Sequence, residues 1–130
     1  TDKPYDDLTT PDQVDDLMQP GSGPAVLDFW STTCGPCRAM APDWARVAQH
    51  YGDAPIRFCK IQTDAYPELA APFQIRSVPT LLFVHDGKIL DAVVGRMDAR
   101  RLAKKVDWLL SKASGGGLLS RLFGGNKGAS

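Results

Sequence analysis

Apolar residues follow two alternating patterns along the chain. Residues 25–30 form an apolar run interrupted by one acid, which is typical of a strand buried on both faces of a sheet. Residues 34–51 place apolar side chains at i, i+3, i+4 and i+7, which predicts an amphipathic helix ending near Gly52. Together the two patterns predict that a buried strand turns into a helix at Cys34.

Strand and helix patterns continue along the rest of the chain. Residues 80–84 and 88–94 are apolar runs separated by His85-Asp86-Gly87, and Asp-Gly between such runs favours a β-hairpin. Four further elements are predicted by their apolar spacing: a short helix at 10–18, a strand at 56–61, a short helix at 67–73 and a helix at 98–112. This order predicts an α/β fold with a central mixed sheet, flanked by helices on both faces.

The length of 130 residues and the hydrophobic fraction of 43% suit one compact domain with two tails. We expect an N-terminal arm at residues 1–9, either poorly ordered or a short edge strand around Tyr5, and the domain at 10–112. Residues 113–130 are predicted to be a flexible Gly-rich tail. Its apolar turn, residues 118–123, is too short for a stable isolated helix, and a disordered end is preferred over a docking segment.

Charge and hydropathy restrict the partners and the compartment. Fifteen basic residues balance fifteen acidic ones, so nothing favours nucleic acid or an anionic membrane. The chain shows no charged start followed by an apolar segment, and no apolar stretch near the roughly 20 residues that span a bilayer. We therefore expect a cytoplasmic protein, although a leader could precede Thr1. Three cysteines are too few for a disulfide-stapled secreted scaffold.

The candidate chemistry is the sequence Cys34-Gly35-Pro36-Cys37 at the predicted strand-to-helix junction. A helix N-terminus offers unpaired N–H groups and a positive dipole end, which favour a thiolate over a thiol. We expect Cys34 to be the exposed, attacking thiol and Cys37, one turn into the helix, to be the shielded, resolving one. A structural disulfide is the alternative. A structural zinc site is less favoured, because it needs about four ligands and the remaining cysteine and histidines lie on different elements.

An acid inside the apolar run, Asp28, is the second candidate. Burial disfavours its charged form and raises its pKa, which suits proton transfer near neutral pH. An outward-facing carboxylate on an edge strand is the alternative. Lys60 occupies a polar position of the strand at 56–61, where a solvated lysine is also compatible, and Cys59 alternates to the opposite face, which favours core packing.

These residues resemble the thioredoxin family over roughly residues 26–110. The resemblance rests on motifs in the family's order and approximate spacing: Leu27-Asp28-Phe29-Trp30, Cys34-Gly35-Pro36-Cys37, Met40-Ala41-Pro42, Lys60, Val78-Pro79-Thr80 and Gly95. It implies a thioredoxin fold and a protein-disulfide reductase that holds no cofactor itself. A flavoprotein thioredoxin reductase drawing on NADPH would supply electrons, and the clients would be disulfide-containing proteins. We expect a monomer.

The resemblance also implies roles for single residues. Asp28 would deprotonate Cys37, with the Lys60 ammonium nearby, and the Val78–Pro79 bond would be cis and face the cysteines. Substrate contacts are expected from residues around Cys34: Trp30, Thr33, Gly35, Pro36, Val78, Pro79 and Gly95. A core position is the alternative for Trp30, and an ordinary loop glycine is the alternative for Gly95. The family usually has tryptophan where this chain has Thr33, which opens the rim of the site and bears on substrate range and donor docking.

Two other functions are compatible with the same residues. One is a specialised periplasmic thioredoxin-like electron carrier, fed by a membrane donor. The other is a binding or holdase module in which thiol turnover is incidental. Replacing Cys34 and Cys37 by serine separates the binding module from the reductase and the electron carrier, because only a binding module would keep its cellular activity.

Overall fold

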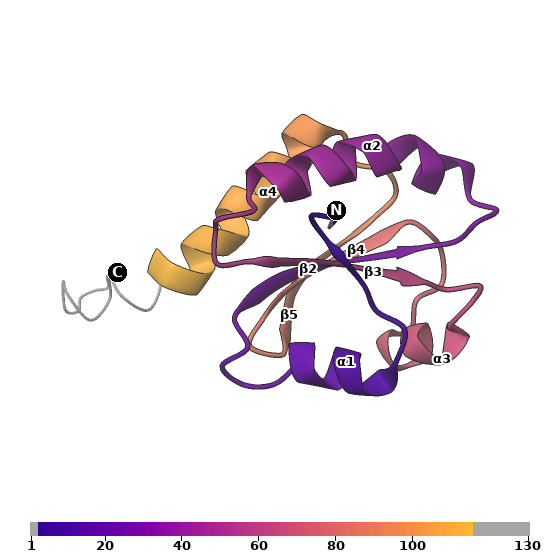
Figure 1. Ribbon diagram of the computed structural model, residues 1–130, viewed down its shortest axis with the longest axis horizontal. Helices are drawn as coiled ribbons and strands as arrows, with labels where there is room; N and C mark the ends of the chain where they lie inside the picture. The colour runs from indigo at the N-terminus through magenta and orange to yellow at the C-terminus, as the bar shows by residue number, and fades with distance from the viewer. Residues whose placement is uncertain (1–2, 116–130) are drawn as a thin grey trace.

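The apolar run predicted as a buried strand is the central strand of a five-stranded sheet in the computed structural model, which describes residues 3–115 (Figure 1). The strands are β1 (Asp6–Asp7), β2 (Pro24–Trp30), β3 (Arg57–Gln62), β4 (Thr80–His85) and β5 (Lys88–Val94). Their order across the sheet is β1-β3-β2-β4-β5. The β1–β3 and β3–β2 pairs are parallel, and the β2–β4 and β4–β5 pairs are antiparallel. The sheet is therefore mixed, as predicted.

Helices cover both faces of this sheet. The helices are α1 (Pro11–Leu17), α2 (Gly35–His50), α3 (Pro67–Ala70), continued by the 3₁₀ turn η1 (Ala71–Phe73), and α4 (Ala99–Leu110). Figure 1 shows α2 and α4 on one face, and α1 and α3 on the other. This arrangement confirms the predicted fold class.

The strand alternation of β2 divides its side chains between two cores. Leu27 and Phe29 pack with residues of α1 and α3, whereas Val26 packs with residues of α2 and α4. Asp28 follows the same alternation as Val26, so its carboxyl lies on the face that α2 covers. The position of this acid is thus fixed by the register of the central strand.

Local signals fix the ends of the elements. Thr10 caps α1 through a capping box with Gln13, which satisfies two N–H groups at the helix start. Asp86 and Gly87 both have positive φ, 53° and 83°, which is the backbone of a two-residue type I′ hairpin turn. The turn is tied to the loop before β2, because the Gly23 N–H donates to the Asp86 carboxylate at 2.7 Å.

Both ends of the domain differ in detail from the sequence prediction. The first segment contains the edge strand β1, which begins directly after Tyr5. Leu8 follows this strand; its side chain is buried, and its N–H donates to the Lys60 carbonyl at 2.9 Å. At the other end, α4 ends at Leu110 and is followed by a π-helical turn over Ser111–Gly115. The predicted apolar turn at 118–123 lies outside the described residues. Within residues 3–115, no helix combines the length and apolarity needed to cross a membrane.

The hairpin turn packs closely against the end of α1, which yields a test of the fold. A Cβ added at Gly87 would lie 2.1 Å from the Met18 carbonyl oxygen, whereas one at Gly21 would meet nothing within 4 Å. The two glycines have nearly the same φ, 83° and 85°. We expect Gly87→Ala to lower the free energy of unfolding by about 3 kcal/mol and Gly21→Ala by about 1 kcal/mol. Equal losses in urea unfolding would show that the hairpin does not press on α1.

Candidate active site

The two cysteines of the Cys-Gly-Pro-Cys sequence form a disulfide at the start of α2. Cys34 is the N-cap residue, and the Cys37 N–H donates to its sulfur at 3.1 Å. Cys34 is partly exposed, whereas Cys37 is 4% exposed. A partner can therefore reach the outer sulfur but not the inner one, and a free N–H group of the helix end points at the sulfur that can be reached.

A small polar network holds the loop between β2 and α2. The Thr32 N–H and hydroxyl both donate to the Asp64 carboxylate, at 3.3 and 2.5 Å, and this hydrogen bonding lowers the pKa of Asp64. The Arg38 guanidinium donates to the Thr32 carbonyl at 2.8 Å. The adjacent Thr33 is exposed, and its hydroxyl lies 3.5 Å from that of Ser31. These contacts fix the approach to Cys34 and leave position 33 open to a partner.

The loop before β4 forms the opposite wall of the site. Its Val78–Pro79 peptide bond is cis, and the Val78 carbonyl oxygen lies 3.6 Å from the Cys34 sulfur. The Pro79 carbonyl accepts a hydrogen bond of 2.8 Å from the Gly95 N–H. The structure thus brings Cys34, Val78, Pro79 and Gly95 together from three separate parts of the chain.

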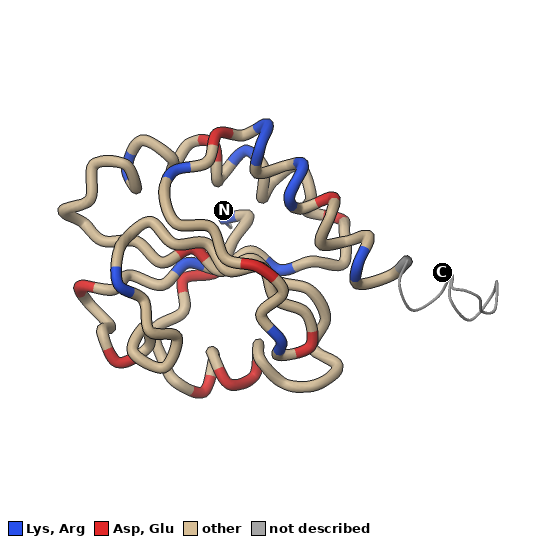
Figure 2. The backbone as a smooth tube through the Cα atoms, turned by 180° about the vertical axis from the view of Figure 1, so that it is seen from behind, with Lys and Arg blue, Asp and Glu red and all other residues tan. Residues whose placement is uncertain are grey.

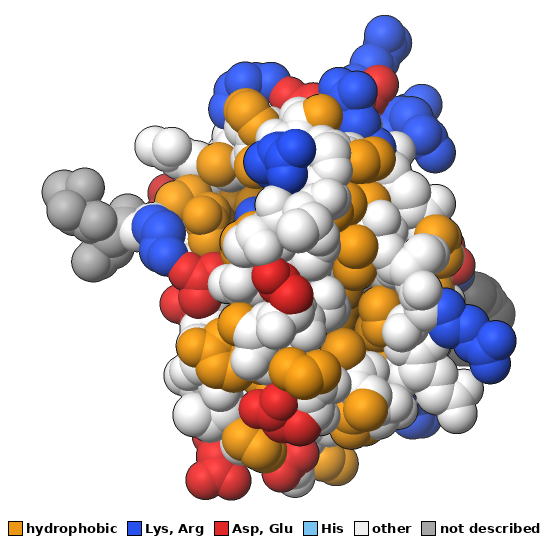
Figure 3. All heavy atoms as spheres, turned by 90° about the vertical axis from the view of Figure 1, so that its right-hand side faces the viewer, with side chains coloured by type: hydrophobic (Ala, Val, Ile, Leu, Met, Phe, Trp, Pro, Cys, Tyr) orange, Lys and Arg blue, Asp and Glu red, His pale blue; other side chains and the backbone are white. Residues whose placement is uncertain are grey.

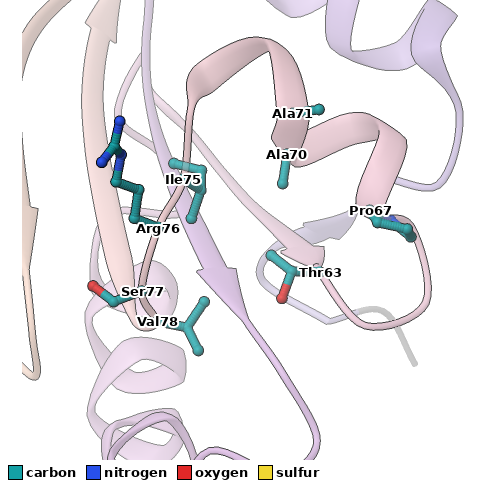
Figure 4. Close-up of a pocket in the computed structure, with 8 residues that line it drawn as sticks. All are labelled: Thr63, Pro67, Ala70, Ala71, Ile75, Arg76, Ser77 and Val78. Atoms are coloured by element: carbon teal, nitrogen blue, oxygen red, sulfur yellow. The ribbon is translucent and has the colours of Figure 1, made fainter.

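A cavity of about 380 Å³ adjoins this loop on the side of α3 (Figure 4). It is lined by residues from the end of β3, from α3 and η1, and from the loop before β4: Thr63, Pro67, Ala70, Ala71, Ile75, Arg76, Ser77 and Val78. Figure 4 shows Ala70 and Ile75 on opposite sides of this space, with Thr63 and Val78 at its lower end. The sequence did not indicate this cavity, because its walls come from segments without a shared motif.

The buried acid predicted from the sequence lies in the core, on the face of the sheet that α2 covers. Asp28 is 1% exposed and Lys60 is 7% exposed, and the two are register partners on β2 and β3. The Lys60 Nζ lies 3.7 Å from Asp28 Oδ2, and Asp28 Oδ1 has no hydrogen-bond partner among the described residues. Burial raises the pKa of Asp28 to about 6, and the Lys60 ammonium limits the rise. The alternatives of a surface carboxylate and a solvated lysine are wrong.

Aromatic rings enclose the Lys60 side chain. Its Nζ lies 4.9 Å from the ring centroid of Trp30 and 5.4 Å from that of Tyr5. Cation–π attraction compensates part of the cost of removing an ammonium from water. Trp30 therefore lies beside the buried charge pair. From the sequence, this residue is expected either in the core or at the wall of the substrate site.

The third cysteine lies away from the cystine chemistry. Cys59 is fully buried among residues packed with α1 and α3, on the opposite face of β3 from Lys60. Burial raises the pKa of its thiol to about 12, so it is a core residue, as expected. In residues 3–115, no group of three or more His, Cys, Asp or Glu side chains could hold a metal ion.

Comparison with known proteins identifies the family. The thioredoxin family model matches residues 7–108. Thioredoxin 1 of Synechococcus elongatus is 42% identical over 84 residues, which is 65% of this chain and 78% of that protein. The thioredoxin of Staphylococcus saprophyticus is 38% identical over 98 residues, 75% of this chain and 91% of the relative.

Solved structures agree with these sequence relatives. The thioredoxin of Malassezia sympodialis has a TM-score of 0.68 at 26% identity and covers 84% of this chain and 90% of its own. Chloroplastic thioredoxin z has the same fold, with a TM-score of 0.70 at 23% identity, and covers 81% of this chain and 93% of its own. The chain therefore belongs to the thioredoxin family, and its Cys34–Cys37 pair makes it a thiol–disulfide oxidoreductase.

Proposed function

We propose that the chain reduces disulfides of client proteins, with Cys34 as the attacking residue and Cys37 as the resolving residue. The observation that carries this proposal is the position of the Cys34 sulfur. It caps a helix, it is accessible, and it lies beside the backbone of a loop that a client can contact. The structure contains the oxidised form, so the reducing cycle begins when a donor has opened this disulfide.

In the first step, the Cys34 thiolate attacks one sulfur of the client disulfide. An S–S bond forms between Cys34 and the client, and the client's own S–S bond breaks to release one client thiolate. The Cys37 N–H, 3.1 Å from the Cys34 sulfur, and the N-terminal end of the α2 dipole stabilise the attacking thiolate.

In the second step, the Cys37 thiolate attacks the Cys34 sulfur. The mixed disulfide breaks, the second client thiolate leaves, and the Cys34–Cys37 bond re-forms, so the pair loses two electrons and the client gains them. Cys37 is buried and must first lose its proton. We assign this proton to Asp28, because burial places the pKa of its carboxyl at about 6, on the face of the sheet that α2 covers.

Clients contact the surface around Cys34. An extended client strand would pair with the backbone at Val78, which is partly exposed beside the Cys34 sulfur. We propose Trp30, Thr33, Gly35, Pro36 and Gly95 as further contact residues, and the hydrogen bond from the Gly95 N–H to the Pro79 carbonyl supports Gly95. The cavity beside Val78 would receive a client side chain near the disulfide.

Electrons come from a flavoprotein thioredoxin reductase that uses NADPH, in the cytoplasm, and the chain acts as a monomer. The family match supports this donor, since thioredoxins are generally reduced by such an enzyme. Thr33 is the residue that tunes this partnership, because it is exposed directly before Cys34. Lys60 supports Asp28 by limiting the rise in the pKa of that carboxyl.

The reductase reading predicts turnover of insulin disulfides with reductase and NADPH. The wild-type chain should reduce insulin catalytically, and Cys34→Ser should have no activity because the attacking sulfur is absent. Thr33→Trp should change the rate with reductase more than the rate with dithiothreitol, because position 33 contacts both the client and the reductase, whereas dithiothreitol needs no docking surface. A reduction potential near the −120 mV of strong oxidants, instead of about −270 mV as is typical of thioredoxins, would contradict a reducing role.

Separate roles for the two cysteines predict a trapped intermediate. Cys37→Ser should attack a client disulfide and accumulate as a mixed disulfide, because no second thiol releases the client. Mass spectrometry of the non-reduced adduct should place the link at Cys34. Cys34→Ser is the matched control and should form no adduct. Adducts of equal yield in both variants would show that either sulfur can be attacked from outside.

The raised pKa of Asp28 predicts how stability depends on pH. The folded chain holds this proton up to about pH 6, whereas an unfolded chain releases it near pH 4. The folded state binds more protons between these values, so the contribution of Asp28 to stability falls as pH rises through this window. Asp28→Asn removes the effect and should gain about 3 kcal/mol relative to wild type between pH 4 and pH 8.

Urea unfolding of the oxidised protein at each pH measures this gain. Asp64→Asn is the control, because the pKa of that exposed carboxyl is lowered and not raised. It should show no gain over the same range. If both variants follow wild type in parallel, the pKa of the Asp28 carboxyl is not raised, and the carboxylate is too weak a base to take the proton of Cys37 near neutral pH.

A further inference from the structure

Opposite charges gather on opposite sides of the sheet, although the net charge is zero. Basic residues follow α4 along the top of Figure 2, and acidic residues follow α1 along its bottom. Figure 3 faces the end of the molecule at which β2 ends and α2 begins, and it shows basic side chains at the top and acidic ones at the bottom. A partner bound at the site therefore meets positive charge on one side of the sheet and negative charge on the other.

A groove of about 510 Å³ lies between β5 and α4, on the basic side. Three apolar and three basic side chains line this α4 groove: Val93, Met97, Trp108, Arg101, Lys104 and Lys105. The Lys105 Nζ lies 4.1 Å from the Trp108 ring centroid and pairs with Asp91. The groove therefore offers apolar contact and positive charge to the same ligand.

Most of the basic residues near this groove have no acidic partner. Arg96, Arg100, Arg101 and Lys104 are exposed, and none of them forms an ion pair with another residue in the range 3–115. The nearby Asp98 carboxylate accepts from the Arg101 N–H as the cap of α4. Unpaired cations concentrated in one place attract anionic groups and raise the association rate with them.

One short segment of the chain runs from the site to the lining of the groove. Gly95 donates to the Pro79 carbonyl beside the cystine, and Met97, two residues further, lines the groove. The Met97 N–H also donates to the Met40 sulfur of α2 at 3.4 Å, which holds this segment in place. A polypeptide that lies in the groove can therefore continue to Cys34 without crossing the molecule.

We propose that the α4 groove docks an acidic segment of a protein partner whose disulfide is presented to Cys34. This inference rests on the proposed function and specifies its substrate class. Charge complementarity selects this occupant over the chain's own tail, because residues 116–130 contain Arg121 and Lys127 and no acid.

The test compares three disulfide peptides of the same length, in which the cystine is flanked by glutamates, by glutamines or by lysines. Pre-reduced protein is mixed with each oxidised peptide in a single turnover, so no reductase is needed. The variant is Arg101→Glu/Lys104→Glu. The matched control is Lys88→Glu/Lys112→Glu, which makes the same change in net charge at exposed residues outside the groove.

Wild type should reduce the glutamate peptide about tenfold faster than the glutamine peptide at low salt, and the advantage should shrink as salt increases. The groove variant should lose this advantage and gain rate with the lysine peptide, whereas the control variant should keep most of it. Equal rates for the three peptides, or equal losses in both variants, would overturn the docking proposal.

Two further measurements distinguish a failure of the docking proposal from a failure of the proposed function. Bis(2-hydroxyethyl) disulfide is small and uncharged, so all variants should reduce it at the wild-type rate. If the wild type reduces no disulfide at all, the proposed function itself fails. Sedimentation of the wild type should show a monomer, and a dimer that Arg101→Glu/Lys104→Glu dissociates would assign the groove to the acidic face of a second copy instead.

Discussion

The site depends on one sulfur that occupies the cap of a helix. Cys34 lies between the central strand of the sheet and α2, so its position is set by the core and its electrostatic environment by the helix end. The Cys37 N–H points at this sulfur from one side, and the Val78 carbonyl approaches it from the other. The proposed thiolate and the proposed surface for the client's backbone therefore depend on the same arrangement of strands.

The buried charge pair of Asp28 and Lys60 has a cost in stability. Asp28 is buried in the centre of the sheet, where its neighbours on β2 are apolar. One of its oxygens has no hydrogen-bond partner among residues 3–115. Lys60 offsets part of this cost at 3.7 Å, and the rings of Trp30 and Tyr5 shield its ammonium. The pKa of Asp28 that results, about 6, keeps the carboxyl able to exchange a proton near neutral pH.

Local patterns were sufficient to predict most of the fold. Residues 25–30, the helix after Cys34 and the Asp86-Gly87 hairpin were predicted because each is encoded within a few adjacent positions. The burial of Lys60 did not follow from alternation, since it depends on its register opposite Asp28. The Thr32–Asp64 link joins residues far apart in the chain, and no motif indicates it. At the C-terminal end of α4, the Ser114 hydroxyl donates to the Leu110 carbonyl and extends the coil into a segment predicted as linker.

The central claim is that the fold makes Cys34 a reactive thiolate while it keeps the other thiols protected. The most direct measurement is alkylation of the reduced protein by iodoacetamide at pH 7, with each cysteine followed by peptide mass spectrometry. The account predicts that Cys34 reacts about tenfold faster than a free peptide thiol. It also predicts that Cys59, buried with a thiol pKa of about 12, stays unmodified. A rate at Cys34 equal to that of the peptide would contradict the account.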